Sequence, residues 1–105
     1  MLKVRNMISI NTGRAIPNQF VIDEINDNYG NIDKEVFQSY DSTIIEIDYV
    51  HDVIAVHDDY NYSKTTGKYR NQFFADNWLP ELATLKGLEE AIKAGKFNNY
   101  AVIRV

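Results

Sequence analysis

The periodicity of the chain changes within residues 62–74, Tyr62-Ser63-Lys64-Thr65-Thr66-Gly67-Lys68-Tyr69-Arg70-Asn71-Gln72-Phe73-Phe74. Thr66, Tyr69 and Phe73 follow one another at steps of three and four residues, which places them on one stripe of a helix. Ser63 is a favourable N-cap because its hydroxyl can accept a hydrogen bond from the free amides of the first turn. The stretch therefore predicts a capped amphipathic helix that ends near Asn77 and is anchored by its aromatic residues.

The residues before this helix predict an antiparallel meander. Short runs of β-branched and aromatic residues alternate there with turns rich in Asn, Asp and Gly. In residues 43–49 the apolar Ile45 and Ile47 alternate with Glu46 and Asp48, so the two kinds of side chain face opposite sides of a strand. The predicted strands are residues 7–10, 20–25, 36–40, 43–49 and 53–57. We expect the second to pair with the third and the fourth with the fifth, each pair as a hairpin.

A second helix and a last strand follow. Thr84 is placed to cap a helix on which Leu85, Leu88 and Ile92 share one face, and Gly95 suits its left-handed C-terminus. Residues 100–105 form the final strand. The order predicts a single α+β domain over residues 1–105, an antiparallel sheet of about five to six strands with two α-helices packed on one face.

Composition narrows the function. The chain has no cysteine, which excludes disulfides, thiolate zinc sites and thiol nucleophiles. No apolar run approaches the roughly 18 residues that span a bilayer, so we expect a soluble intracellular protein without a membrane partner. The net charge of −4 disfavours nucleic-acid binding by the whole surface, because phosphate affinity depends on cations.

The charge of the chain changes sign at Ser63. Residues 23–62 hold 11 Asp and Glu against the single cation Lys34, whereas residues 63–105 hold seven Lys and Arg against four Asp and Glu. Carboxylates on adjacent strands lie roughly 5–7 Å apart, close to the spacing of phosphates along a nucleic acid. Such a surface can compete for the basic groove of a nucleic-acid-binding protein, although a solvated polar face is the plainer interpretation. The candidate partner-binding residues on this acidic face are Glu46, Asp48, Asp52, Asp58 and Asp59.

Residues 63–105, which carry the excess of Lys and Arg, offer an alternative binding region. The free amides at a helix start can hold an anion with the help of nearby cations. The candidate anion-binding residues are Ser63, Lys64, Thr65, Lys68 and Arg70. The basic region 64–96 would then bind nucleic acid, with Tyr62 and Tyr69 available for stacking. A phosphate-binding loop is excluded because Tyr69 follows the lysine and position 62 is not glycine. A structural or assembly role, in which the two charged regions dock head to tail, is a third possibility.

No constellation predicts catalysis. His51 and His57 are each followed by aspartate, but a straight strand would separate them by about 20 Å, too far for one mononuclear metal site. Asp41, Glu46 and Asp48 resemble part of a metal-dependent nuclease pattern, but they lack the lysine that would follow two residues later. No serine lies in a nucleophile elbow. We therefore expect a protein that is not an enzyme and has no catalytic residues, no metal and no cofactor.

Two segments carry a family resemblance. Phe37-Gln38-Ser39-Tyr40-Asp41-Ser42 is followed about twenty residues later by Tyr62-Ser63-Lys64-Thr65-Thr66, with Lys68-Tyr69 and Gln72-Phe73 beyond it. Together with Phe20-Val21-Ile22 they resemble a family of small uncharacterised bacteriophage and prophage proteins over roughly residues 17–97. The chain departs from that pattern in its longer 26–35 turn and in the strand after Phe97. The resemblance implies a viral accessory protein that acts on a host or phage protein in the bacterial cytoplasm, with no known catalytic residues to transfer.

Overall fold

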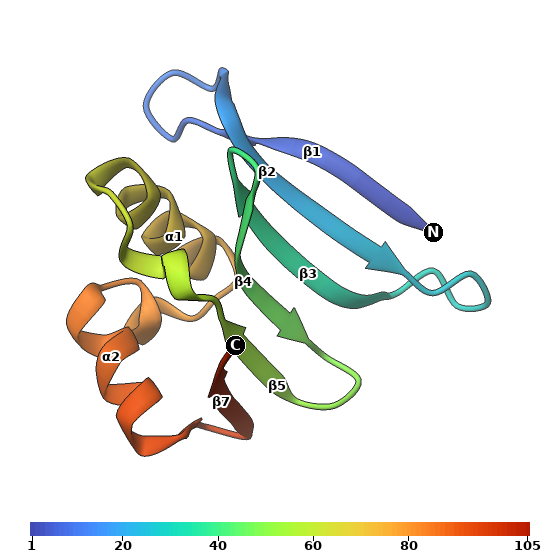
Figure 1. Cartoon of the computed structure of the whole chain (residues 1–105). Coiled ribbons are helices and arrows are strands. Elements are labelled where there is room, and N and C mark those ends of the chain that lie inside the picture. The colour runs from blue at the N-terminus through green and yellow to red at the C-terminus, as the bar shows by residue number, and fades with distance from the viewer.

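Seven strands form one sheet in the order β1-β2-β3-β4-β5-β7-β6 in the computed structural model, which describes residues 1–105 (Figure 1). The strands are β1 Leu2–Ile8, β2 Ala15–Ile25, β3 Ile32–Ser39, β4 Ser42–Asp48, β5 Val53–Val56, β6 Lys96–Phe97 and β7 Tyr100–Arg104. β1 to β5 form an antiparallel meander, and β7 joins β5 in parallel. The α+β class and both expected hairpins are confirmed, but the expected count of five to six strands was too low.

The differences from expectation lie at the ends of the sheet. β1 begins at Leu2, whereas the sequence predicted a strand at residues 7–10, because Lys3 and Arg5 interrupt the apolar pattern of this edge strand. β2 begins at Ala15 and runs through Pro17, whereas the sequence predicted a strand over residues 20–25. Pro17 lies where the ladder to β1 is irregular, and a bulge is one of the places in which a sheet accepts a residue without an amide hydrogen. The two-residue strand β6 was not expected.

Both helices begin at the predicted caps. α1 spans Lys64–Asp76 and α2 spans Leu85–Ala94, with the short 3-10 helices η1 Asp58–Asn61 and η2 Pro80–Leu82 before them. The Ser63 hydroxyl accepts from the Thr66 amide at 3.1 Å, and the Thr84 hydroxyl accepts from the Gly87 amide at 3.0 Å. Gly95 ends α2 with a φ of 72°. Neither helix is long and apolar enough to cross a membrane.

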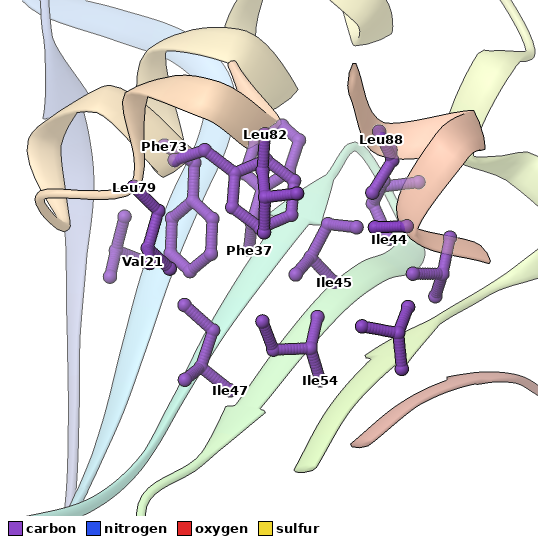
Figure 2. Close-up of a cluster of buried hydrophobic side chains, with 14 of the residues drawn as sticks. Val21, Phe37, Ile44, Ile45, Ile47, Ile54, Phe73, Leu79, Leu82 and Leu88 are labelled. Carbon is purple, nitrogen blue, oxygen red and sulfur yellow. The ribbon is translucent and has the colours of Figure 1, made fainter. Parts of the chain in front are cut away.

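The helices cover one face of the sheet, and the core lies between the two layers (Figure 2). Phe37, Ile45 and Ile47 point from the strands into this core and are fully buried. Phe73 of α1 stacks on Phe37 with 5.7 Å between ring centroids, and Tyr69 packs at the margin, as the helical stripe predicted. We call this side of the sheet the covered face.

Candidate functional site

The opposite side of the sheet carries no second layer. Strand pairing sets Val4 opposite Ile22, Ile22 opposite Val36, and Val36 opposite Glu46. The chain neighbours of Ile22, Val36 and Glu46 lie on the covered face, so these three side chains and the paired Val4 point away from the helices. We call this side the outer face. Its residues are Leu2, Val4, Asn6, Phe20, Ile22, Glu24, Lys34, Val36, Gln38, Thr43, Glu46, Asp48, Val53, Ala55, His57, Ala101 and Ile103.

An apolar strip crosses β1, β2 and β3 on the outer face, between polar residues at either end of these strands. Val4 is 61% exposed and Leu2 is 65% exposed, while Phe20, Ile22 and Val36 are half-buried beside them. A shallow groove of about 260 Å³ is lined by Val4, Phe20, Ile22 and Gln38. The sequence reading missed this apolar strip, although Phe20, Val21 and Ile22 place apolar residues on both sides of one strand. That pattern is the signal that could have revealed it.

Glu46 lies at the centre of the outer face and is paired within the chain. Its carboxylate lies 3.8 Å from Lys34 Nζ and 2.7 Å from His57 Nε2. Lys34 comes from β3 and His57 directly follows β5, the strands on either side of β4. Glu46 is therefore accessible in part, but its charge is offset by pairing with Lys34 and His57.

Two more of the predicted acidic residues stabilise turns. Asp48 accepts from the Val50 and His51 amides, each at 3.0 Å, and its other oxygen lies 2.9 Å from His51 Nδ1. Desolvation acts to raise the pKa of Asp48, but the hydrogen bonds from His51 and Val50 outweigh it and hold the pKa below its usual value. Asp52 has a φ of 54° and accepts from the Asn99 side chain at 3.3 Å. Both residues therefore stabilise the β4–β5 connection, in addition to lying at the surface.

The remaining two predicted acidic residues lie beyond the other end of β5. Asp58 pairs with Arg104 at 2.9 Å, whereas the Asp59 carboxylate makes no hydrogen bond or ion pair within the chain. Asp52 and Asp58 flank β5, six residues apart, or about 20 Å along an extended strand. The five candidates therefore do not form one patch: Asp48 and Asp52 lie toward one end of the sheet, Asp58 and Asp59 lie at the other, and Glu46 lies between them.

Two further acidic residues face the core. Asp23 and Glu35 lie directly opposite each other on the covered face, 6% and 4% exposed. Arg5 of β1 reaches both, at 3.9 Å and 3.6 Å. Burial, then a hydrogen bond with Asp23 and the negative charge of Asp23, raise the pKa of Glu35 to about 7. Strand parity could have found this pair, because Asp23 and Glu35 each lie two residues from a core position, Val21 or Phe37.

The predicted anion-binding group is only partly brought together. Ser63, Lys64, Thr65 and Lys68 are exposed at the start of α1. Arg70 is 2% exposed and donates to the Tyr60 carbonyl at 2.6 Å and to the Asn71 side chain at 2.9 Å. The expectation that Arg70 offers its charge at the surface is therefore wrong, because its guanidinium supports the loop before α1.

No three His, Asp or Glu side chains are grouped closely enough to hold a metal ion. His51 and His57 are paired with different carboxylates, Asp48 and Glu46.

The chain was compared with families of known sequences, with curated proteins and with solved structures. A family model described as a family of unknown function (DUF8033) matches residues 2–89. No curated protein and no solved structure was found to be similar to the chain. The match supports the expectation of an uncharacterised family only in that general form, and it assigns no chemistry to any residue.

Proposed function

We propose, from the premise that the chain belongs to a family of unknown function (DUF8033), that it is a non-enzymatic protein whose outer face binds a basic protein. The observation that carries the proposal is the apolar strip on an uncovered sheet face, bordered by carboxylates. Val4 and Ile22 lie in this strip, and Glu24 and Glu46 border it. Apolar area gives affinity in protein interfaces, while charge on the rim selects the partner and speeds encounter.

The charge beside the strip favours a basic partner. A depression of about 290 Å³ is lined by Glu24, Asp33, Lys34, Asp48, Val50 and His51. It continues the outer face toward the β2–β3 and β4–β5 turns, where Asp52 is also exposed. Carboxylates outnumber cations at this end of the sheet, so an acidic partner would be repelled.

The resemblance to bacteriophage and prophage proteins supplies the setting that we propose. There the chain is a viral accessory protein in the cytoplasm of a bacterial host. Its partner is a host protein that handles nucleic acid or takes part in defence, and the chain inhibits that partner by occupying its basic groove. The acidic end of the outer face, from Glu24 to Asp52, is the part that would enter such a groove.

The two alternatives receive less support. Direct nucleic-acid binding would use Lys64, Lys68 and the cations of α2, but Arg70 is buried and Arg104 is paired with Asp58. An assembly role would join the acidic end of one copy to the helices of another. Both alternatives remain as outcomes of the experiment below.

The experiment uses the tagged full chain as bait in a bacterial lysate, followed by binding measurements with the purified partner. We expect a basic protein that is released near 1 M salt, where the screening length falls to about 3 Å. Glu24→Lys on the outer face and Glu90→Lys on α2 make the same charge change on opposite sides of the molecule. We expect Glu24→Lys and Val4→Ser to weaken binding, and Glu90→Lys to leave it nearly unchanged.

Three results would contradict the proposal. Equal weakening by Glu24→Lys and Glu90→Lys would mean that only overall charge matters. A mobility shift of a nucleic-acid probe that Lys64→Ala with Lys68→Ala abolishes would favour the basic alternative. Self-association in light scattering, lost at high salt, would favour the assembly role.

A further inference from the structure

A second concave surface lies between the β3–β4 turn and the start of α1, away from the outer face. It is a cleft of about 600 Å³, formed by chain segments 39–44 and 59–66. The segments meet inside it, where the Ser39 and Thr66 hydroxyls lie 3.3 Å apart. The Thr66 hydroxyl also accepts from the Ser63 hydroxyl at 3.2 Å. The cleft is therefore held by contacts between segments distant in sequence, and the proposed function does not use it.

The wall of the cleft is rich in hydrogen-bond acceptors. Five hydroxyl side chains line it: Ser39, Ser42, Ser63, Thr65 and Thr66. Two tyrosines, Tyr40 and Tyr62, line it as well and are 55% and 79% exposed. Tyr40 holds a left-handed φ of 54° in the two-residue turn, a position that usually takes Asn or Gly. An aromatic side chain is thus kept at the mouth of the cleft at some cost in backbone energy.

The only charged side chains in the cleft are negative. Asp41 and Asp59 line it, neither carboxylate has an ion pair or hydrogen bond within the chain, and no lysine or arginine lines it. An anion would meet two carboxylates there. The Ser63 hydroxyl already satisfies the Thr66 amide at the start of α1. The anion-binding role expected for Ser63 and Thr65 is therefore disfavoured in this cleft.

We propose that the cleft binds an organic cation, an alkylammonium or guanidinium group. Asp41 and Asp59 supply the opposite charge, and the hydroxyl oxygens accept hydrogen bonds from its N–H groups. Tyr40 and Tyr62 offer aromatic faces, which attract such cations. The same chemistry could come from a lysine or arginine side chain of another protein or from a free polyamine. The binding group is the same in both cases.

The test titrates the isotope-labelled full chain with two probes, the free amine agmatine and a tri-arginine peptide with blocked ends, and follows backbone amide resonances. We expect saturable shifts at Asp41, Ser42, Asp59 and Thr65. Asp41→Asn with Asp59→Asn should weaken binding about tenfold, because two attractive charges are lost. Tyr62→Leu should weaken it about threefold through the lost aromatic face. Glu81→Gln with Glu90→Gln removes the same charge from exposed positions elsewhere and should leave the affinity unchanged.

The two probes separate the sources of the cation: tighter binding of agmatine indicates a free polyamine, and tighter binding of the peptide indicates a protein side chain. Equal affinities of the two double variants would overturn the proposal. Shifts of the same amides by inorganic phosphate or by glucose at lower concentration than agmatine would also overturn it. Because Asp41 and Asp59 are exposed, an unchanged amide spectrum of the free variant checks that its fold is intact.

Discussion

The two faces of the sheet differ in a way that reverses the usual assignment of polar residues to the surface. The covered face buries Phe37, but it also buries the carboxyl pair of Asp23 and Glu35. The outer face exposes Val4 and presents Ile22 beside it. Buried carboxyls and exposed apolar side chains are the informative exceptions in a small domain. The covered face therefore supplies most of the folding stability, and no second layer of the chain covers the outer face.

The largest expected loss of folding stability comes from a substitution on the covered face. Phe37→Ala removes a fully buried ring that stacks on Phe73 at 5.7 Å between centroids. Truncating a buried phenylalanine typically costs about 3–5 kcal/mol of unfolding free energy. Urea denaturation followed by circular dichroism measures the loss.

Val36→Ala is the matched control, one residue along β3 and on the outer face. Because Val36 is only half-buried, its truncation should cost less than about 1 kcal/mol. If the two substitutions destabilise the protein equally, the outer face is covered in solution, and the contrast between the faces is wrong.

The second effect is a dependence of folding stability on pH. The pKa of Glu35 is raised from 4.5 to about 7, first by burial and then by Asp23. Between these two values the folded chain keeps a proton that the unfolded chain releases, so the contribution of Glu35 to stability is highest below pH 4.5 and is lost as pH rises to about 7. We expect the protein to lose on the order of 2 kcal/mol between about pH 4.5 and pH 7 through this group. Above that range Glu35 contributes no further slope.

Glu35→Gln should remove that slope and stabilise the protein at neutral pH, as measured by urea denaturation across the range. Asp48→Asn is the comparison near the outer face and should act in the opposite direction. The pKa of Asp48 is lowered by hydrogen bonds from His51 and Val50 despite desolvation, so its contribution is present above the unfolded pKa and lost as pH falls. A Glu35→Gln variant with the wild-type slope would show that the carboxyl pair is not the source.

Much of the fold could be predicted because its signals are local. Alternation along residues 43–49 placed Ile45 and Ile47 in the core and Glu46 on the other side, and Ser63 and Thr84 marked both helix starts. The parallel pairing of β7 with β5 could not be predicted in this way, because it joins segments on either side of both helices. Local alternation also gives no register between strands.

The candidate site was harder to predict for the same reason. A count of charges along the chain puts Asp23 and Glu46 in one acidic group. In the sheet, however, Asp23 faces the core and Glu46 lies on the outer face. The partners of Glu46 depend on strand register, since His57 lies 11 residues away in the sequence. Arg70 was counted as basic surface because its burial depends on the loop before α1 folding over it.

The smallest expected effects on stability come from making the same substitution, valine to threonine, once on each face of the sheet. Val21→Thr places a hydroxyl on the covered face, where Val21 is 3% exposed, and should cost about 1–3 kcal/mol because a buried hydroxyl without a partner is unfavourable. Val4→Thr makes the same change on the outer face, where Val4 is 61% exposed, and should alter stability by less than about 0.5 kcal/mol. Both changes keep a β-branched side chain, so strand propensity is held nearly constant. If Val4→Thr is as costly as Val21→Thr, and its cost grows with protein concentration, a second copy covers the outer face. If Val4→Thr leaves folding stability unchanged but weakens binding of the basic partner, the outer face is the binding surface.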